Sequence, residues 1–262
     1  MSVAKDLYHR LIPEQVRNPI GLFRRRLIDR WLRAKAGERL PSAELLGNIQ
    51  LTPWISEYLD IGERAAAAIE RAAALGGIRP EVPHDVLDFG CGSGRSIRHL
   101  RDTRWTLTGC DIDREAIEWC QLSISGAKFV VSPVEPPLEF EDGSFDLAYA
   151  ISVFTHFDPE AQRAWAREMS RILRPGGLLL VSTMGPGVIE NFPDHATPET
   201  REILAREGSV FLPAAESSFN AHAAFHTPRA LGMLFAPDLE LMRWVEQGLD
   251  GFQDLSVLRK RG

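Results

Sequence analysis

The chain has 262 residues, a formal net charge of −6, 44% hydrophobic residues and 25% charged residues. These values are typical of a globular protein, and the length suits one large domain or one domain with a cap. The sequence shows neither an apolar run of about 20 residues, which a membrane-spanning helix needs, nor a signal-peptide pattern, so we expect a cytoplasmic protein. The three cysteines match neither a disulfide framework nor a zinc-ligand pattern, which indicates reduced thiols.

Positive charge is concentrated near the N-terminus. Residues 17–36 carry a net charge of +6, which leaves −12 for the rest of the chain. This acidic remainder argues against a nucleic-acid partner, because such binding depends on Lys and Arg side chains. Within Leu7–Lys35, apolar residues such as Phe23, Leu27 and Trp31 recur at helical spacing, with arginines on the other face. This predicted helix has two interpretations, packing on the main domain with solvated arginines or weak peripheral contact with anionic lipid.

A second helix is predicted over Pro53–Leu75, with Thr52 as its N-cap and Gly76-Gly77 as its end. Short apolar runs then alternate with helical patterns, which predicts a parallel sheet with helices on both faces. The expected strands are Val86–Phe89, Trp105–Cys110, Lys128–Val131, Phe145–Ile151 and Leu178–Val181, and the expected helices between them are Ser96–Leu100, Arg114–Leu122 and Pro159–Leu173.

The C-terminal third departs from this alternation. Residues 185–226 contain four prolines and are expected to form an insertion or cap. A short helix is predicted to begin at Thr227-Pro228. The runs Leu239–Val245 and Phe252–Leu258, separated by two glycines, predict a closing antiparallel hairpin. We expect an N-terminal helical extension over residues 1–80 and a main domain over residues 81–262.

The first predicted strand leads into a glycine-rich loop that contains Gly90, Gly92 and Gly94. Ligands of open α/β sheets bind outside the carboxyl ends of the strands, where the first turn must let the backbone approach the ligand. The dinucleotide fingerprint Gly-x-Gly-x-x-Gly fails here because Arg95 occupies the position of its third glycine. A Gly-Lys-Ser/Thr ending, typical of nucleotide phosphate loops, is also missing.

Asp111 ends the next predicted strand, nineteen positions after Gly92. A carboxylate at this place can accept hydrogen bonds from both hydroxyls of a ribose. Nicotinamide cofactors and methyl-donor cofactors both use such an acid. Asp111 therefore indicates a nucleoside cofactor without identifying it, and a capping acid at a strand end is the alternative.

Five segments between Val86 and Thr183 carry a more specific pattern. They are Val86-Leu-Asp-Phe-Gly-Cys-Gly-Ser-Gly94, Gly109-Cys-Asp-Ile-Asp113, Phe140-Glu-Asp-Gly-Ser-Phe-Asp-Leu147, Ser152-Val-Phe-Thr-His156 and Leu173-Arg-Pro-Gly-Gly-Leu-Leu-Leu180. In this order they resemble the class I S-adenosylmethionine-dependent methyltransferases, particularly the small-molecule branch. The resemblance implies an α/β, doubly wound, seven-stranded Rossmann-like sheet with S-adenosyl-L-methionine as cofactor.

The same resemblance implies a role for each motif. Asp88 and the loop from Gly90 to Gly92 would hold the methionine part, Asp111 the ribose, and Ile112 one face of the adenine. Many relatives have an acid or amide where this chain reads Ser132-Pro-Val-Glu135, which favours recognition by the backbone of Val134, with Glu135 as the alternative. Arg95 could pair with the cofactor carboxylate or be a solvated arginine. The expected cofactor-binding residues are Asp88, Gly90, Cys91, Gly92, Arg95, Asp111, Ile112, Val134, Glu135 and Ser152.

Methyl transfer from a sulfonium is an in-line displacement, so the protein must align the acceptor and exclude water. An alcohol acceptor also loses a proton as it attacks. His156 follows the predicted strand Phe145–Ile151 and is our candidate base. The alternative is that its imidazole fixes the loop over the cofactor by hydrogen bonding.

His222 and His226 have a spacing that would place both imidazoles on one helix face. No Cys cluster or His-Glu motif accompanies them, so we expect no metal site. We expect both to contact the acceptor, together with Phe157, and local structure is the alternative. The segments Ala224–Pro228 and Gly251–Lys260 loosely resemble methyltransferases of polysaccharide or secondary-metabolite assembly, which adds Gln253 and Asp254 as substrate candidates.

The expected function is therefore O-methylation of a small-molecule acceptor, a hydroxyl of a sugar or secondary metabolite. Two alternatives stay open, a nicotinamide-dependent oxidoreductase and a non-catalytic S-adenosylmethionine-binding protein.

Overall fold

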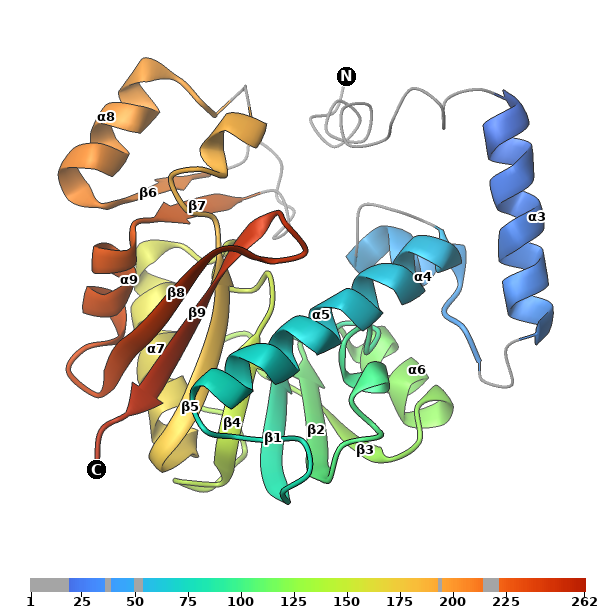
Figure 1. The fold of residues 1–262 in the computed structure, drawn as a ribbon, viewed down its shortest axis with the longest axis horizontal. Coiled ribbons are helices and arrows are strands. Elements are labelled where there is room, and N and C mark those ends of the chain that lie inside the picture. Colours follow the sequence, from blue (N-terminus) through green and yellow to red (C-terminus); the bar gives the residue numbers. More distant parts are fainter. Residues whose placement is uncertain (1–18, 36–38, 50–53, 193–194, 214–221) are drawn as a thin grey trace.

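A computed structural model describes residues 19–35, 39–49, 54–192, 195–213 and 222–262 (Figure 1). Its helices are α3 (Pro19–Lys35), α4 (Ala43–Ile49), α5 (Ile55–Leu75), α6 (Arg114–Ser123), α7 (Pro159–Ile172), α8 (Pro198–Glu207) and α9 (Pro228–Phe235), with the short 3₁₀ helices η1 (Ile97–His99) and η2 (Ile189–Asn191). Its strands are β1 (His84–Phe89), β2 (Trp105–Asp111), β3 (Ala127–Val131), β4 (Phe145–Ala150), β5 (Leu173–Thr183), β6 (Ser209–Leu212), β7 (Ala223–His226), β8 (Leu239–Leu249) and β9 (Gln253–Lys260).

The main sheet has seven strands in the order β3-β2-β1-β4-β5-β9-β8. The first five are parallel, whereas β9 pairs antiparallel with both β5 and β8. The strand order reverses between β1 and β4, and ligands of such sheets bind at this switch point. The predicted doubly wound α/β fold with a closing antiparallel hairpin is confirmed.

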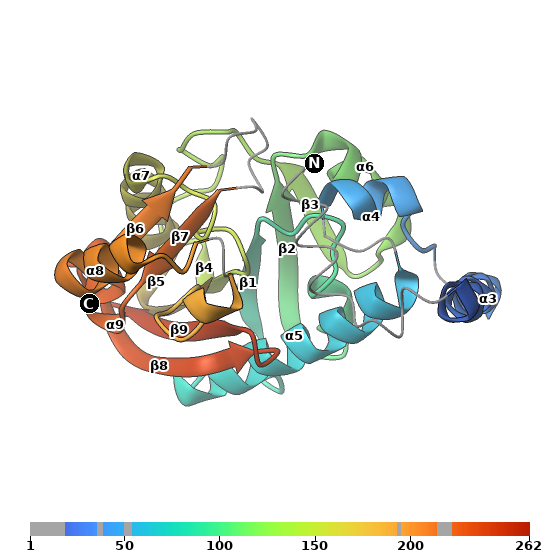
Figure 2. The ribbon, with the colours of Figure 1, turned by 90° about the horizontal axis from the view of Figure 1, so that it is seen from above.

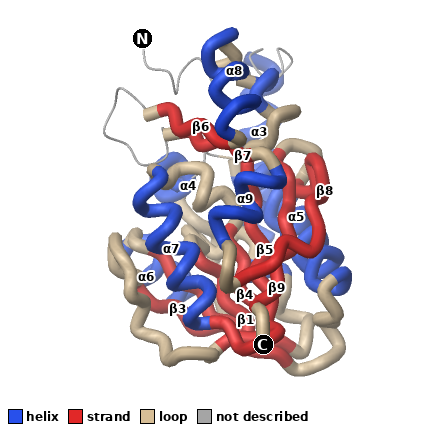
Figure 3. The backbone as a smooth tube through the Cα atoms, turned by 90° about the vertical axis from the view of Figure 1, so that its left-hand side faces the viewer, coloured by secondary structure: helices blue, strands red, loops and turns tan. Residues whose placement is uncertain are grey.

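Successive side chains of each strand point to opposite faces of the sheet, so the strands contribute to two hydrophobic layers. On one face, Val86 of β1 packs with Ile69 of α5 and Ile117 of α6. On the other face, Leu87 packs with Trp165 of α7 and Phe235 of α9. Figure 3 shows the sheet between α7 and α5. Burial on both faces explains why the central strands read as continuous apolar runs rather than as alternating patterns.

The N-terminal helices differ in detail from the prediction. The part of Leu7–Lys35 before Pro19, and the predicted cap pair Thr52-Pro53, lie outside the described residues. Helix α5 begins at Ile55, with Trp54 at the N-cap position and no side-chain cap from that residue. The capping acceptor is instead Asp29 of α3, whose carboxylate accepts hydrogen bonds from the backbone amides of Ile55 (3.1 Å) and Ser56 (3.4 Å). A side chain from another helix thus satisfies donors that a helix start leaves unpaired.

The predicted helix Ser96–Leu100 is wrong in type, because the structure has only the 3₁₀ turn η1. The chain reverses directly after it. The backbone amide and hydroxyl of Thr103 both donate to the carbonyl of Leu100 (3.1 and 2.6 Å), and the amide of Arg104 bonds the carbonyl of Pro80 (2.7 Å). With β2 beginning at Trp105, only one turn fits after the glycine loop.

Residues 185–226, the cap segment, contain η2, α8 and the two-stranded antiparallel sheet β6-β7. This segment has its own hydrophobic cluster, which includes Val188, Leu204 and Phe225. Strand β7 attaches it to the main sheet, because the amides of Ala224 and His226 donate to the carbonyls of Thr155 (2.8 Å) and Met184 (2.9 Å). Thr155 follows β4 and Met184 follows β5, so the cap segment lies at the carboxyl ends of these strands (Figures 1 and 3).

Among the described residues, no helix combines the length and apolar character that crossing a membrane requires.

Candidate functional site

The glycine loop follows β1 and has a backbone conformation that residues with a Cβ atom rarely adopt. Gly90, Gly92 and Gly94 have φ angles of +76°, +51° and +71°, in the left-handed region that glycine adopts without steric cost. A Cβ atom at Gly90 would lie 2.4 Å from Cγ2 of Val153. The amides of Gly90 and Cys91 donate to the carbonyl of Cys110 (2.8 and 3.0 Å), which holds the loop over the end of β2.

Asp111 closes the loop from the end of β2. Its carboxylate accepts the amides of Gly92 (2.7 Å) and Asp113 (2.9 Å), and burial raises its pKa. Two large apolar side chains near the ends of neighbouring strands remain in solvent: Ile112, the next residue after Asp111, is 47% exposed, and Val134, which follows β3, is 61% exposed. Glu135 is exposed as well. An acceptor carboxylate flanked by uncovered apolar side chains suits a ribose with an attached planar base.

Asp88 lies below the loop on β1, where only 3% of it is exposed. Burial, with a smaller effect from the Asp111 carboxylate, raises the pKa of Asp88 to about 8, while its contact with Tyr149 on β4 and the charge of Arg95 oppose this shift. Arg95 is only partly exposed rather than a solvated surface arginine. Burial lowers the pKa of its guanidinium, and the charges of Asp88 and Asp250 raise it.

Two further residues hold the loop from behind, and the sequence did not indicate either. The Tyr58 hydroxyl of α5 donates to the carbonyl of Ser93 (2.7 Å). The Arg98 guanidinium donates in turn to the Tyr58 oxygen (3.1 Å). Both side chains are buried. Tyr58 precedes the loop by some thirty residues without any recognisable motif, so the contact emerges only from the packing of α5.

At the carboxyl end of β4, Ser152 has a φ of +59°, a conformation that costs a non-glycine residue energy. Its amide donates to the Ser182 hydroxyl (2.7 Å) at the end of β5. Both hydroxyls donate to Oε1 of Gln253, at 3.0 Å from Ser152 and 2.7 Å from Ser182. The three side chains therefore fix the end of β4 against β5 and β9. Ser152 and Gln253 were predicted site residues, and Ser182 was missed.

His156 lies four residues after Ser152, in the turn between β4 and α7. Its Nδ1 lies 3.0 Å from the carbonyl oxygen of His222. Because a carbonyl only accepts, Nδ1 must carry the proton, which leaves the lone pair on Nε2. Burial lowers the pKa of His156, and the hydrogen bond to His222 partly offsets that shift. The structure thus joins His156 and His222, and it leaves the lone pair of the His156 imidazole on Nε2.

His226 has different surroundings. The amide nitrogen of Gln162 donates to the carbonyls of Phe154 (3.3 Å) and Phe157 (3.0 Å), so its oxygen faces His226 and accepts from Nε2 (3.0 Å). Only 3% of His226 is exposed, and burial lowers its pKa to about 4. His222 directly precedes the strand β7 and His226 is its last residue, so the predicted shared helix face is wrong. The burial of His226 favours its structural alternative over acceptor contact.

Phe157 and Asp254 are the remaining substrate candidates. Phe157 is half-buried and stacks on Trp165, with ring centroids 6.1 Å apart and planes 12° apart. Asp254 is buried, and its carboxylate accepts the amide of Gln247 (2.7 Å). A Cβ atom at Gly185 would lie 1.7 Å from the other Asp254 oxygen. Asp254 therefore packs against the chain where the cap segment begins.

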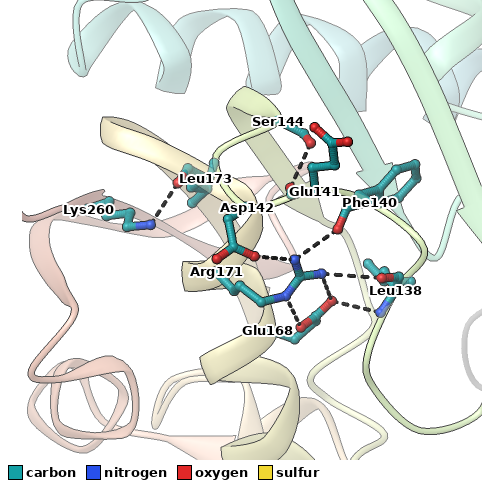
Figure 4. Close-up of polar contacts among 9 residues, drawn as sticks. All are labelled: Leu138, Phe140, Glu141, Asp142, Ser144, Glu168, Arg171, Leu173 and Lys260. Carbon is teal, nitrogen blue, oxygen red and sulfur yellow. Dashed lines mark hydrogen bonds and ion pairs between the residues drawn. The ribbon is translucent and has the colours of Figure 1, made fainter.

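The segment between β3 and β4, which contains the third matching motif, is fixed to α7 by Arg171 (Figure 4). The guanidinium donates to the carbonyls of Phe140 (2.8 Å) and Leu138 (3.2 Å) and pairs with Asp142 (2.6 Å) and the buried Glu168 (2.7 Å). Glu168 also accepts the amide of Leu138 (2.7 Å). This motif therefore builds the scaffold beneath the site.

The three cysteines are buried beside the loop. Burial, with a smaller effect from the charge of Asp88, raises the pKa of each thiol. In the part of the chain that the structure describes, no three His, Cys, Asp or Glu side chains form a group that could hold a metal ion.

Comparison with known proteins shows what the segment that contains this site is similar to. A methyltransferase domain model matches residues 87–181, the stretch from β1 to β5. The chain is 35% identical over 128 residues to phthiotriol/phenolphthiotriol dimycocerosates methyltransferase 1 of Mycobacterium ulcerans, a match that covers 47% of this chain and 46% of that one. It is 28% identical to the O-methyltransferase cnsE of Penicillium expansum, covering 64% and 63%. The chain thus spans less than two thirds of the length of either relative.

Solved structures agree on the fold. The Burkholderia thailandensis 1,6-didemethyltoxoflavin-N1-methyltransferase, crystallised with S-adenosylhomocysteine, superposes with a TM-score of 0.54 at 20% identity, covering 86% of this chain and 92% of that one. The matched domain contains the glycine loop, Asp111 and the β4 end, in the strand order given above. Residues 87–181 are thus similar to a methyltransferase domain, and the fold of the chain is that of solved S-adenosylmethionine-dependent methyltransferases.

Proposed function

We propose that the protein transfers the methyl group of S-adenosylmethionine to a hydroxyl of a small-molecule acceptor, with His156 as the base. The observation that supports this proposal is the hydrogen bond from His156 Nδ1 to the His222 carbonyl. It leaves Nε2 as the basic nitrogen, and no described residue donates a hydrogen bond to it. Several relatives are named O-methyltransferases, including that of Penicillium expansum.

The residues around the loop fit the cofactor. Glycines with positive φ let the backbone approach the methionine part, and Asp111 offers its carboxylate to the ribose hydroxyls. Ile112 and Val134 provide exposed apolar contact for the adenine, with the Val134 backbone or the Glu135 side chain at its edge. Arg95, near Asp88, would balance the charge around the amino-acid part of the cofactor. When bound, the cofactor supplies an electrophilic methyl group.

The chain's own residues would then handle the acceptor. His156 Nε2 takes the hydroxyl proton as the oxygen attacks, a contribution of about 10²- to 10⁴-fold for a positioned base. Its lowered pKa keeps it neutral, and so competent, at neutral pH. No described residue accepts a hydrogen bond from the amide nitrogen of Gln253, which could donate to an acceptor oxygen. Phe157 and His222 would line the acceptor side, and the cap segment would exclude water.

The acceptor class is identified by incubating the purified protein with methyl-labelled cofactor and separate pools of sugars, phenols, other alcohols, amines and carboxylates. Two relatives bear names of apolar acceptors, a dimycocerosate lipid and a phytyl hydroquinone, so prenyl and acyl alcohols belong in the alcohol pool. We expect label in a hydroxylated pool. Label confined to amines would overturn O-methylation, and no label in any pool would favour a non-catalytic binding protein.

The role of His156 is tested with the acceptor so found. His156→Gln should leave S-adenosylhomocysteine affinity unchanged by calorimetry and lower kcat about a hundredfold. In the wild type, kcat should fall on acidification below about pH 6.5, because burial lowers the pKa of His156 from that value, and this acid limb should vanish in the variant. His84→Gln, at the start of β1 and the opposite end of the strand from the loop, is the control. Near-unchanged turnover in His156→Gln would refute the base.

A further inference from the structure

Helix α3 exposes an unusual combination of side chains. Phe23, Leu27 and Trp31 follow at intervals of four and share one helix face, and they are 63%, 49% and 55% exposed. Ile28 beside them is 49% exposed. Large side chains with this exposure form a continuous apolar strip, because residues four apart are neighbours on a helix surface.

The opposite face of α3 attaches it to the protein. Leu32 packs against the buried cluster of Leu46, Ile55 and Tyr58. Asp29 caps α5, and Arg25 pairs with Glu57 of that helix. The orientation of α3 is therefore set by α5, and the apolar strip is the face turned away. Figures 1 and 2 both show α3 at the end of the molecule opposite α8.

Positive charge borders this strip. Arg26, Arg30, Arg33 and Lys35 are exposed, and the Lys35 ammonium lies 4.6 Å from the centre of the Trp31 ring. The one acidic residue of α3, Asp29, is 9% exposed and occupied as a cap. Among the described side chains of α3, the exposed ones are thus cationic, apolar or small, on a chain whose net charge is −6.

We propose that α3 is a docking helix for an anionic lipid surface. A cationic amphipathic helix lies in the headgroup region, with apolar side chains toward the acyl chains and Lys and Arg toward lipid phosphates. Anionic lipid complements the arginines, and the acidic remainder of the chain disfavours any deeper approach. Aromatic and aliphatic side chains flanked by cations match this partner better than a second copy of this acidic chain, whose surface offers charge but no acyl layer.

This surface is linked to the cofactor loop through α5. Asp29 holds the first turn of α5, and Tyr58, one turn further on, bonds the carbonyl of Ser93 in the loop. Helix α5 thus contacts both the proposed docking helix and the glycine loop. The proposal concerns binding alone, so it does not depend on O-methylation.

The test is co-sedimentation of the full chain with vesicles of phosphatidylcholine alone or mixed with phosphatidylglycerol. We expect binding to the mixed vesicles at low salt and its loss in pure phosphatidylcholine and at high salt, since screening weakens the ionic part. Arg26→Glu with Arg30→Glu should lower the partition coefficient about tenfold or more. Trp31→Ser with Phe23→Ser should lower it by a similar factor.

Matched control variants separate a specific role of α3 in vesicle binding from general effects of changing surface charge or apolar surface. Arg114→Glu with Arg229→Glu makes the same charge change at exposed positions of α6 and α9, and Met233→Ser removes an exposed apolar side chain of α9. Both should bind vesicles like the wild type. Unchanged S-adenosylhomocysteine affinity in the α3 variants, measured by calorimetry, shows that they fold. Absence of binding to the mixed vesicles, equal loss in the controls, or α3-dependent dimers in sedimentation without vesicle binding would overturn the proposal.

Discussion

The buried side chain of His226 makes the stability of the folded protein depend on pH. Its Nε2 donates to Gln162, and its Nδ1 is buried with no hydrogen-bond partner in the described part of the chain. A second proton would place an unpaired charge in the interior, so the pKa of His226 falls to about 4, against about 6.5 in an unfolded chain. The unfolded state therefore binds the extra proton more readily. The contribution of neutral His226 to the free energy of unfolding is therefore full above about pH 6.5 and is lost as the pH falls toward 4.

The variant His226→Gln should remove this pH dependence, because an amide can replace the hydrogen bond but does not titrate. Between about pH 7.5 and 5, the wild type should lose about 2 kcal/mol of unfolding free energy more than the variant does. Urea unfolding at both pH values measures this difference, and comparing the two losses cancels the other titrating groups. Equal losses in the two proteins would show that His226 is not the group responsible.

Residues whose role follows from local chemistry could be predicted from the sequence. Gly90 and Gly92 were identified because a tight turn after a strand needs positive φ, and Asp111 because it ends the next strand. Tyr58 and Ser182 were not, since each acts on a partner some thirty residues away through a hydrogen bond that any hydroxyl could make. Such contacts become visible only when the packing of the elements is known.

Helices and strands were likewise predicted where their signals are local in the sequence. The five parallel strands and the final hairpin were predicted, because their apolar runs and turn glycines are local signals. The end of α5 at Gly76 was predicted as well, whereas its start was not, because the capping acid Asp29 belongs to α3. In the cap segment the sequence showed only prolines. Its short strands β6 and β7 pair with each other, and β7 is also held by the residues that follow β4 and β5.

The junction of β4, β5 and β9 permits a prediction about positioning. Gln253→Leu removes the acceptor of two hydroxyls, and each buried polar group left unpaired costs about 1–3 kcal/mol. We expect a lower unfolding free energy and, because Ser152 is then free to leave its left-handed conformation, a several-fold weaker affinity for S-adenosylhomocysteine. Gln253→Glu retains an acceptor oxygen and should restore much of that affinity.

Ser256→Ala is the matched control for this experiment. Ser256 lies on the same strand, wholly buried, and no described residue bonds its hydroxyl. Its removal should cost little stability and leave ligand affinity unchanged. Equal effects of Gln253→Leu and Ser256→Ala would mean that Gln253 only fills space.

At the scale of the whole molecule, the loops after β1, β2, β3 and β4 and the buried Tyr58 of α5 meet around one proposed cofactor site. A ligand that binds the folded chain alone stabilises it by mass action, by about 2.7 kcal/mol at a hundredfold excess over its Kd. We expect S-adenosylhomocysteine to raise the Tm by several degrees, since a domain of this size gains about 2–4 °C per kcal/mol. Differential scanning calorimetry at increasing ligand concentration measures the shift.

The same titration separates the candidate cofactors. Asp111→Ala removes the carboxylate proposed for the ribose and also the partner of the Gly92 amide, so it should lower the Tm without ligand and shrink the shift that S-adenosylhomocysteine produces. NAD and NADP should produce no shift, because Arg95 stands where the dinucleotide loop requires a third glycine. A shift with NAD equal to that with S-adenosylhomocysteine would contradict this account of the loop. If the ribose binds at Asp111, loss of this carboxylate must weaken the affinity for S-adenosylhomocysteine. An undiminished Tm shift in Asp111→Ala would therefore mean that the ribose binds elsewhere.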